Sequence, residues 1–96
     1  MITRADLPRG VQAAQIAHAA GSAGRHPPGT YVVVLMVPDE ISLRRLARKF
    51  EERDIAHELV TESDLPYDGQ AMAIGCELVK DRSRIRKEVA NLPLFR

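Results

Sequence analysis

The chain has 96 residues, enough for one domain with a single core but too few for a second lobe. Hydrophobic residues make up 45% and charged residues 28%, as in ordinary globular proteins. No apolar run approaches the roughly 20 residues that cross a bilayer, and no basic-then-apolar leader is visible, so we expect no membrane span and no signal peptide. The single cysteine, Cys76, cannot form an internal disulfide, which favours a cytoplasmic location.

The net charge of +1 is unevenly distributed along the chain. Residues 59–77 contain four acidic residues and no lysine or arginine, whereas residues 78–96 contain six basic and two acidic residues. Residues 1–30 add three arginines against one aspartate. Positive ends that flank an acidic stretch can form a local phosphate-binding surface. Ordinary solvated surface charge explains the same distribution equally well.

The first part of the chain predicts a short strand, a helix and a longer strand. The helix is dense in strong helix formers and is expected to stop at Gly21. The longer strand is apolar and β-branched throughout, which is typical of a strand covered on both faces. Four residues are few for the first strand, so either it is truncated or Met1 is an internal methionine of a longer chain. The predicted segments are the strand 1–4, a turn at 6–8, the helix 12–20, a loop at 25–29 and the strand 31–37.

The second part predicts two helices around a pair of strands. Asp39 is expected to cap a helix whose apolar residues recur at helical spacing and whose other face is cationic. A final helix, capped by Asp81 or Ser83, precedes an apolar tail that should dock on the core. The apolar helix positions are Leu43, Leu46, Ala47 and Phe50, and the cationic ones are Arg44, Arg45, Arg48 and Lys49. The two strands are predicted over 57–61 and 70–75, with a loop at 64–69 between them. On the last helix, Ile85 and Val89 are four residues apart and face the same way. The apolar residues of the tail are Leu92, Leu94 and Phe95.

The order β-α-β-α-β-β-α predicts one domain over residues 1–96. We expect a layered α/β sandwich with a mixed sheet of about four strands, helices on both faces and a short first strand. The three histidines, His18, His26 and His57, do not have metal-ligand spacing, and no phosphate-binding glycine motif follows a strand. No metal or cofactor is therefore expected.

The first predicted helix carries a polar stripe. With 100° per residue, Gln15, His18 and Ser22 fall near Val11 on one side, while Ala13, Ala17 and Ala20 form another side. We expect the alanines to pack on the sheet and the polar stripe to point toward an edge or cleft. A histidine beside an amide is able to activate and orient water. Spacing alone favours a structural role, with the His18 ring bonded to backbone or water.

Several segments together resemble one protein family. Arg4-Ala5-Asp6-Leu7, a turn with Gly10, and AAQIAHA at 13–19 are similar to the N-terminal signature of the type II peptidyl-tRNA hydrolases, in which R-x-D-L leads through a glycine and lysine turn to A-A-Q-x-x-H-A. The resemblance continues through VVLMVPDEISL at 33–43, LVTE at 59–62, QAMAIG at 70–75 and LPL at 92–94. It covers nearly the whole chain, and the ordered set is more specific than any one motif.

The resemblance implies hydrolysis of the ester that joins a peptide to tRNA, without metal or cofactor, and a tRNA partner. By position it implies that His18 and Glu62 activate or orient water, with Gln15 positioning water or substrate. It also implies that Arg4, Asp6, Arg9, Gln12 and Gln70 bind substrate, with Arg4 and Asp6 at a pocket rim and Arg9 on a phosphate. The choice of general base stays open, as does a homodimer.

Three residues depart from the family pattern. Val11 replaces a lysine, Gln70 a threonine and Cys76 a proline, and we expect all three to lie at the site rather than in the core. An alternative interpretation is therefore a non-catalytic module that keeps the fold and binds RNA through residues such as Arg9, Arg82 and Arg84. A protein-binding role through a sheet edge or the cationic helix face is also open.

Overall fold

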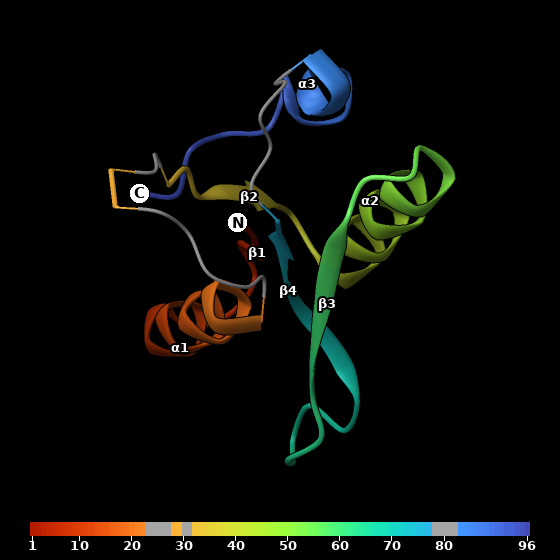
Figure 1. Ribbon diagram of the computed structural model, residues 1–96. Helices are drawn as coiled ribbons and strands as arrows, with labels where there is room; N and C mark the ends of the chain where they lie inside the picture. The colour runs from red at the N-terminus through yellow and green to blue at the C-terminus, as the bar shows by residue number, and fades with distance from the viewer. Residues whose placement is uncertain (23–27, 30–31, 78–82) are drawn as a thin grey trace.

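The computed structural model describes residues 1–22, 28–29, 32–77 and 83–96, without the side chains of Ser22 and Arg84. It is an α/β domain built on one four-stranded mixed sheet, as predicted, with a short first strand. The helix α1 lies on one side of the sheet and α2 on the other (Figure 1). The elements are β1 (Ile2–Arg4), α1 (Arg9–Ser22), β2 (Leu35–Val37), α2 (Glu40–Glu52), β3 (His57–Glu62), β4 (Gln70–Cys76) and α3 (Ser83–Val89).

The strand order is β2-β1-β4-β3. β1 runs parallel to β2 and antiparallel to β4, and β3 and β4 form a long antiparallel hairpin that extends beyond the helices (Figure 1). This topology brings the last residue of β1, Arg4, to the same end of the sheet as the first residue of β4, Gln70, and the last of β3, Glu62. Arg4, Gln70 and Glu62, which lie in different parts of the sequence, are therefore found at the same end of the sheet.

The prediction for α2 is confirmed. Asp39 caps the helix, its carboxylate accepting a hydrogen bond from the Ser42 N–H at 2.9 Å. The four predicted apolar positions are buried, and Phe50 has no exposed area. The four cationic positions of the opposite face are exposed. Ile85, Val89 and Leu92 pack against the same core, so α3 shares the α2 face of the sheet.

The packing predicted for α1 is wrong. Ala13 and Ala17 are exposed, while Gln12, Gln15 and Ala19 are buried against the sheet. The helix also begins at Arg9, earlier than predicted, and continues through Gly21. Alanine side chains bury too little apolar area to decide a helix orientation. Two buried glutamine amides that hydrogen-bond to the sheet edge decide it instead.

The strand predicted over 31–37 is shorter than expected. Within the described residues 32–37, only Leu35–Val37 is strand, and Val32 and Val33 are exposed, so these residues are not covered on both faces. The tail lies along the outer edge of β2, where Phe95 N–H donates to Val34 O and Met36 N–H to Pro93 O. Of the predicted apolar tail, Leu92 reaches the core but Leu94 is half exposed. The predicted loop at 25–27 and the Asp81 cap lie outside the described residues.

Candidate functional site

A buried amide on α1 contacts a carboxylate at the end of β3. Gln15 is 4% exposed, and its Nε2 donates to Glu62 Oε2 at 3.3 Å. His18 follows one helical turn later on the exposed side of α1 and lies near enough for its charge to act on Glu62. Gln15, His18 and Glu62, the three residues predicted for catalysis, are thus brought together at one edge of the sheet.

The Glu62 carboxylate is stabilised in its ionised form. Its Oε1 accepts a hydrogen bond from the Asp64 N–H at 3.0 Å, and this bond is the largest cause of its lowered pKa. The Gln15 amide and the charge of His18 act in the same direction. A carboxylate that is stabilised in this way is a weak base but a good hydrogen-bond acceptor. Glu62 is therefore suited to orienting a neighbouring group.

The second polar atom of the Gln15 amide is unused. Gln15 Oε1 is buried and has no hydrogen-bond partner among the described residues. An unsatisfied buried acceptor costs about 1–3 kcal/mol, so such atoms usually receive a donor from water or a ligand. Because Nε2 is held by Glu62, the orientation of the amide is fixed, and Oε1 is the atom that remains without a partner. The Gln15 amide therefore has one hydrogen-bonded atom, Nε2, and one atom without a partner, Oε1.

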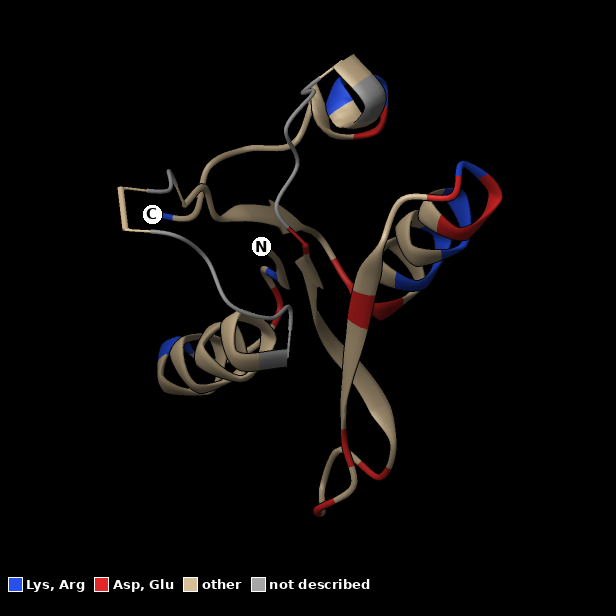
Figure 2. Ribbon diagram, viewed as in Figure 1, with Lys and Arg blue, Asp and Glu red and all other residues tan. Residues whose placement is uncertain are grey.

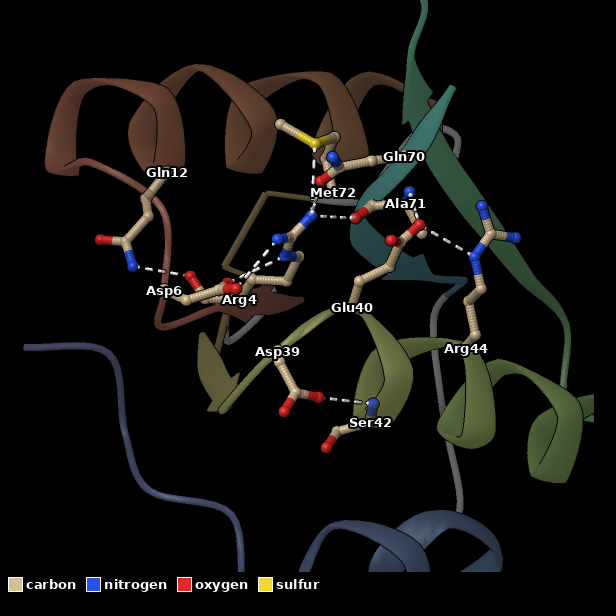
Figure 3. A network of polar contacts seen from close by, with 10 residues as sticks. All are labelled: Arg4, Asp6, Gln12, Asp39, Glu40, Ser42, Arg44, Gln70, Ala71 and Met72. Carbon is tan, nitrogen blue, oxygen red and sulfur yellow. Dashed lines mark hydrogen bonds and ion pairs between the residues drawn. The ribbon is translucent and has the colours of Figure 1, made fainter. Parts of the chain in front are cut away.

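Arg4 lies at the centre of a polar network (Figure 3). Its Nε and Nη2 donate to the two carboxylate oxygens of Asp6, both at 2.9 Å, and its Nη1 donates to Gln70 Oε1 at 2.8 Å and to Ala71 O at 3.1 Å. The hydrogen bond with Asp6 is the largest cause of the raised pKa of Arg4. Arg4 is 7% exposed, so it does not lie at a pocket rim as expected. Its guanidinium hydrogen-bonds to Asp6, Gln70 and Ala71 and thereby joins β1 to β4 at this end of the sheet.

Two charged side chains bond the backbone of Ala71. The N–H donates to Glu40 Oε2 at 2.8 Å, and the carbonyl accepts from Arg4 (Figure 3). A β-bulge lies next to this residue: the register between β3 and β4 shifts after Val60, so Met72 has no partner on β3, while Ala71 pairs with Thr61. Arg44 donates to Glu40 and to the Gly69 carbonyl. These bonds tie the start of α2 to the hairpin that carries Glu62.

Sequence reasoning did not identify Glu40 as part of this network. The bond joins residues 31 positions apart, and the sequence around Glu40 does not indicate that partner.

The remaining predicted binding residues have different surroundings. Gln12 is buried and its Nε2 donates to the Arg4 carbonyl at 2.7 Å, so it supports the network from α1 (Figure 3). Arg9 is exposed, and its guanidinium carbon lies 4.7 Å from the centre of the Phe95 ring. Val11 is half-buried in the first turns of α1. Asp6, Gln70 and Arg4 form one cluster, from which Arg9 is separate.

Two further expectations about the site can be compared with the structure. Cys76 does not lie at the site: it pairs with His57 at the far end of the hairpin, opposite the end where Glu62 pairs with Gln70. Gln70 does lie at the site, where its amide oxygen accepts from Arg4. The predicted RNA contact Arg82 and the side chain of Arg84 lie outside the described residues.

Charge is segregated over the described surface. Basic positions recur along α2, and acidic positions mark the β3–β4 hairpin and its loop (Figure 2). Arg45, Arg48 and Lys49 are exposed and have no hydrogen bond or ion pair with any described residue. The candidate site lies on the α1 side of the sheet near the acidic hairpin loop, whereas the cationic positions of α2 lie on the opposite side.

Other candidate sites within the described residues are weak. An open cavity of about 720 Å³ lies at the start of β3, lined by Glu51, Asp54, Ile55, His57, Glu58 and Leu59 among others. It contains none of the predicted site residues. No group of three or more metal-ligating side chains occurs in the described ranges. No described helix has the length and apolar character needed to cross a membrane.

No protein-family model and no curated protein matches the chain.

Proposed function

We propose that the chain hydrolyses the ester bond of peptidyl-tRNA at the site formed by Gln15, His18 and Glu62. The observation that carries the proposal is the Gln15 amide, which donates to Glu62 and leaves a buried oxygen without a partner. A water molecule that donates one hydrogen to Gln15 Oε1 would have a fixed position next to His18. The resemblance of the sequence to type II peptidyl-tRNA hydrolases gives the substrate class.

In this mechanism His18 is the general base. A histidine side chain titrates near neutrality and can accept a proton from water at physiological pH, whereas the lowered pKa of Glu62 makes it a poor base. The water oxygen attacks the ester carbonyl carbon, and its proton passes to His18. The tetrahedral intermediate then collapses, the bond to the 3′ oxygen of the ribose breaks, and that oxygen takes the proton. Glu62 stabilises the protonated His18 through its charge.

The charge distribution supports an orientation for the substrate. The acidic loop after Glu62, with Asp64 and Asp68, repels phosphate and suits the peptide side of the ester. The exposed Leu65 at the same tip offers apolar contact to peptide side chains. The tRNA would approach from the side of Arg9, at the start of α1.

A peptide-release assay with a model peptidyl-tRNA tests the proposal. We expect turnover by the full chain, and a loss of about 10²- to 10⁴-fold in His18→Ala. Glu62→Gln should also be impaired, whereas Glu58→Gln, an exposed position on the same strand, should not. Release by His18→Ala at the rate of the unchanged chain, or no turnover by correctly folded protein, would refute the proposal.

The pH dependence of release distinguishes the two candidate bases. With His18 as base, the rate at saturating substrate should continue to rise with pH above about pH 5. With Glu62 as base, the rate would already be constant above about pH 5, because the carboxylate is ionised there. A profile that is flat from pH 5 to 8 would contradict the role assigned to His18.

The second candidate function is an RNA-binding module without hydrolysis. Val11 and Gln70, which depart from the family pattern, favour it, since both lie near the candidate site. Cys76 no longer contributes to this argument, because it lies at the far end of the hairpin. Salt-dependent tRNA binding without any release, in protein that is folded by circular dichroism, would favour the module over the enzyme.

A further inference from the structure

Arg9 and Phe95 form a contact between the two ends of the described chain. The Arg9 guanidinium carbon lies 4.7 Å from the centre of the Phe95 ring, within the range of a cation–π interaction. Arg9 belongs to the first turn of α1, and Phe95 to the tail along the outer edge of β2.

The position of Phe95 is fixed by its backbone. Its N–H donates to Val34 O at 2.8 Å, and the neighbouring Leu94 forms an antiparallel bridge with Leu35. Pro93 accepts a further hydrogen bond from Met36. The ring therefore belongs to a tail segment that is hydrogen-bonded to β2, and it is half-buried. A flexible arginine side chain that stacks on such a ring loses much of its conformational freedom before any ligand binds.

Arg9 has no anionic partner within the described residues. The nearest acidic residue along the chain is Asp6, and both of its carboxylate oxygens are occupied by Arg4. Arg9 is exposed and takes part in no hydrogen bond or ion pair with the described residues. A guanidinium placed over an aromatic ring does not use its N–H groups for hydrogen bonds to that ring, so they remain available to phosphate oxygens.

We propose that Phe95 is a positioning residue that holds the Arg9 guanidinium for contact with a backbone phosphate of the tRNA. The inference rests on the proposed function for the identity of the ligand. Phe95 itself adds no charge, so its effect is on the affinity of one phosphate contact and not on the number of contacts. The two residues should therefore behave as one unit when they are mutated.

The test is a double-mutant cycle of tRNA binding, measured by fluorescence anisotropy at several salt concentrations. Deacylated tRNA is the probe and His18→Ala the background, so that hydrolysis plays no part. We expect Arg9→Ala to lower the salt slope by about one phosphate contact, roughly 0.7–0.9. Phe95→Leu should weaken binding about three- to tenfold with an unchanged slope. Phe95→Tyr keeps an aromatic face and should bind like the parent.

The cycle has outcomes that overturn the proposal. In the Arg9→Ala background, Phe95→Leu should have no further effect; an equal loss there would show that Phe95 acts without Arg9. If the salt dependence of tRNA binding were unchanged in Arg9→Ala, Arg9 would make no phosphate contact and the proposal would be wrong. Inorganic phosphate at constant ionic strength should not compete at millimolar concentration, and competition that disappears in Arg9→Ala would assign the site to free phosphate. Thermal unfolding of each variant checks that the tail remains docked.

The same data separate this inference from the proposed function. If peptide release is absent but the binding cycle behaves as expected, only the hydrolase fails and the phosphate contact stands. If release is present and Phe95→Leu binds tRNA like the parent, the hydrolase stands and the positioning role of Phe95 is wrong.

Discussion

Gln15 Nε2 donates to Glu62 Oε2 across 3.3 Å, and this bond joins the middle of α1 to the last residue of β3. The two residues are 47 positions apart in the sequence. The bond fixes which atom of the Gln15 amide faces Glu62 and therefore which atom remains for a ligand. Substitutions of Gln15 therefore test both peptide release and the stability of this end of the sheet.

Replacing Gln15 with leucine should separate catalysis from stability. Gln15→Leu removes the unsatisfied oxygen together with the donor, and Glu62 is exposed enough to hydrogen-bond to water instead. We expect the free energy of unfolding to change by less than about 1 kcal/mol and peptide release to fall by about 10²-fold. Urea denaturation and the release assay measure the two effects. Unchanged release would show that the amide does not position water.

Arg4→Met should destabilise the domain strongly. The change leaves the Ala71 carbonyl and the Gln70 amide without their donor and frees the Asp6 carboxylate. We expect a loss of about 2–4 kcal/mol in the free energy of unfolding. Arg48→Met is the matched control, because Arg48 is exposed and should change stability by no more than about 0.5 kcal/mol. If the two substitutions changed the free energy of unfolding equally, the Arg4 network would not contribute to stability.

Glu40→Ala should loosen the bulge in β4. The substitution removes the acceptor of the Ala71 N–H, which is fully buried. A loss of about 1–3 kcal/mol is expected, with faster hydrogen exchange of the Ala71 amide by NMR. Glu51→Ala, an exposed position on the same helix, should leave that amide unchanged. Protection of Ala71 that persists in Glu40→Ala would assign the bond to another acceptor.

Stability should decrease in acid. The pKa values of Asp39, Glu40 and Glu62 are all lowered, in each case mainly by a hydrogen bond from a backbone N–H, of Ser42, Ala71 and Asp64 respectively. A carboxylate whose pKa is lower in the folded than in the unfolded chain adds stability above its unfolded pKa of about 4. That contribution is lost as the pH falls through the folded pKa.

Urea denaturation between pH 2 and 7 measures this dependence. We expect a nearly constant contribution from these groups down to about pH 5 and a decline below it. The triple variant Asp39→Asn, Glu40→Gln, Glu62→Gln should show a shallower decline. A maximum of stability near pH 3 would contradict the assigned hydrogen bonds.

The sequence by itself determined the elements whose signals are local. The helix α2 was predicted with its cap and its buried face because Leu43, Leu46 and Phe50 recur at helical spacing, and this spacing concerns neighbours on one helix. The strands β3 and β4 were also predicted, β4 as a mostly apolar segment after the turn residues Pro66 and Gly69. The alternation of these elements was enough to predict the mixed four-stranded sheet.

Only the tertiary structure decided how these elements face one another. Alanines along α1 are compatible with burial or exposure, so the buried face was set by the distant partners of Gln12 and Gln15, namely the Arg4 carbonyl and Glu62. The register shift opposite Met72 depends on pairing between strands, and the bonds of Ala71 to Glu40 and Arg4 join distant segments. The Arg9–Phe95 contact joins residues 86 positions apart. None of these features has a local signal, because each is a contact between segments that only the folded chain brings together.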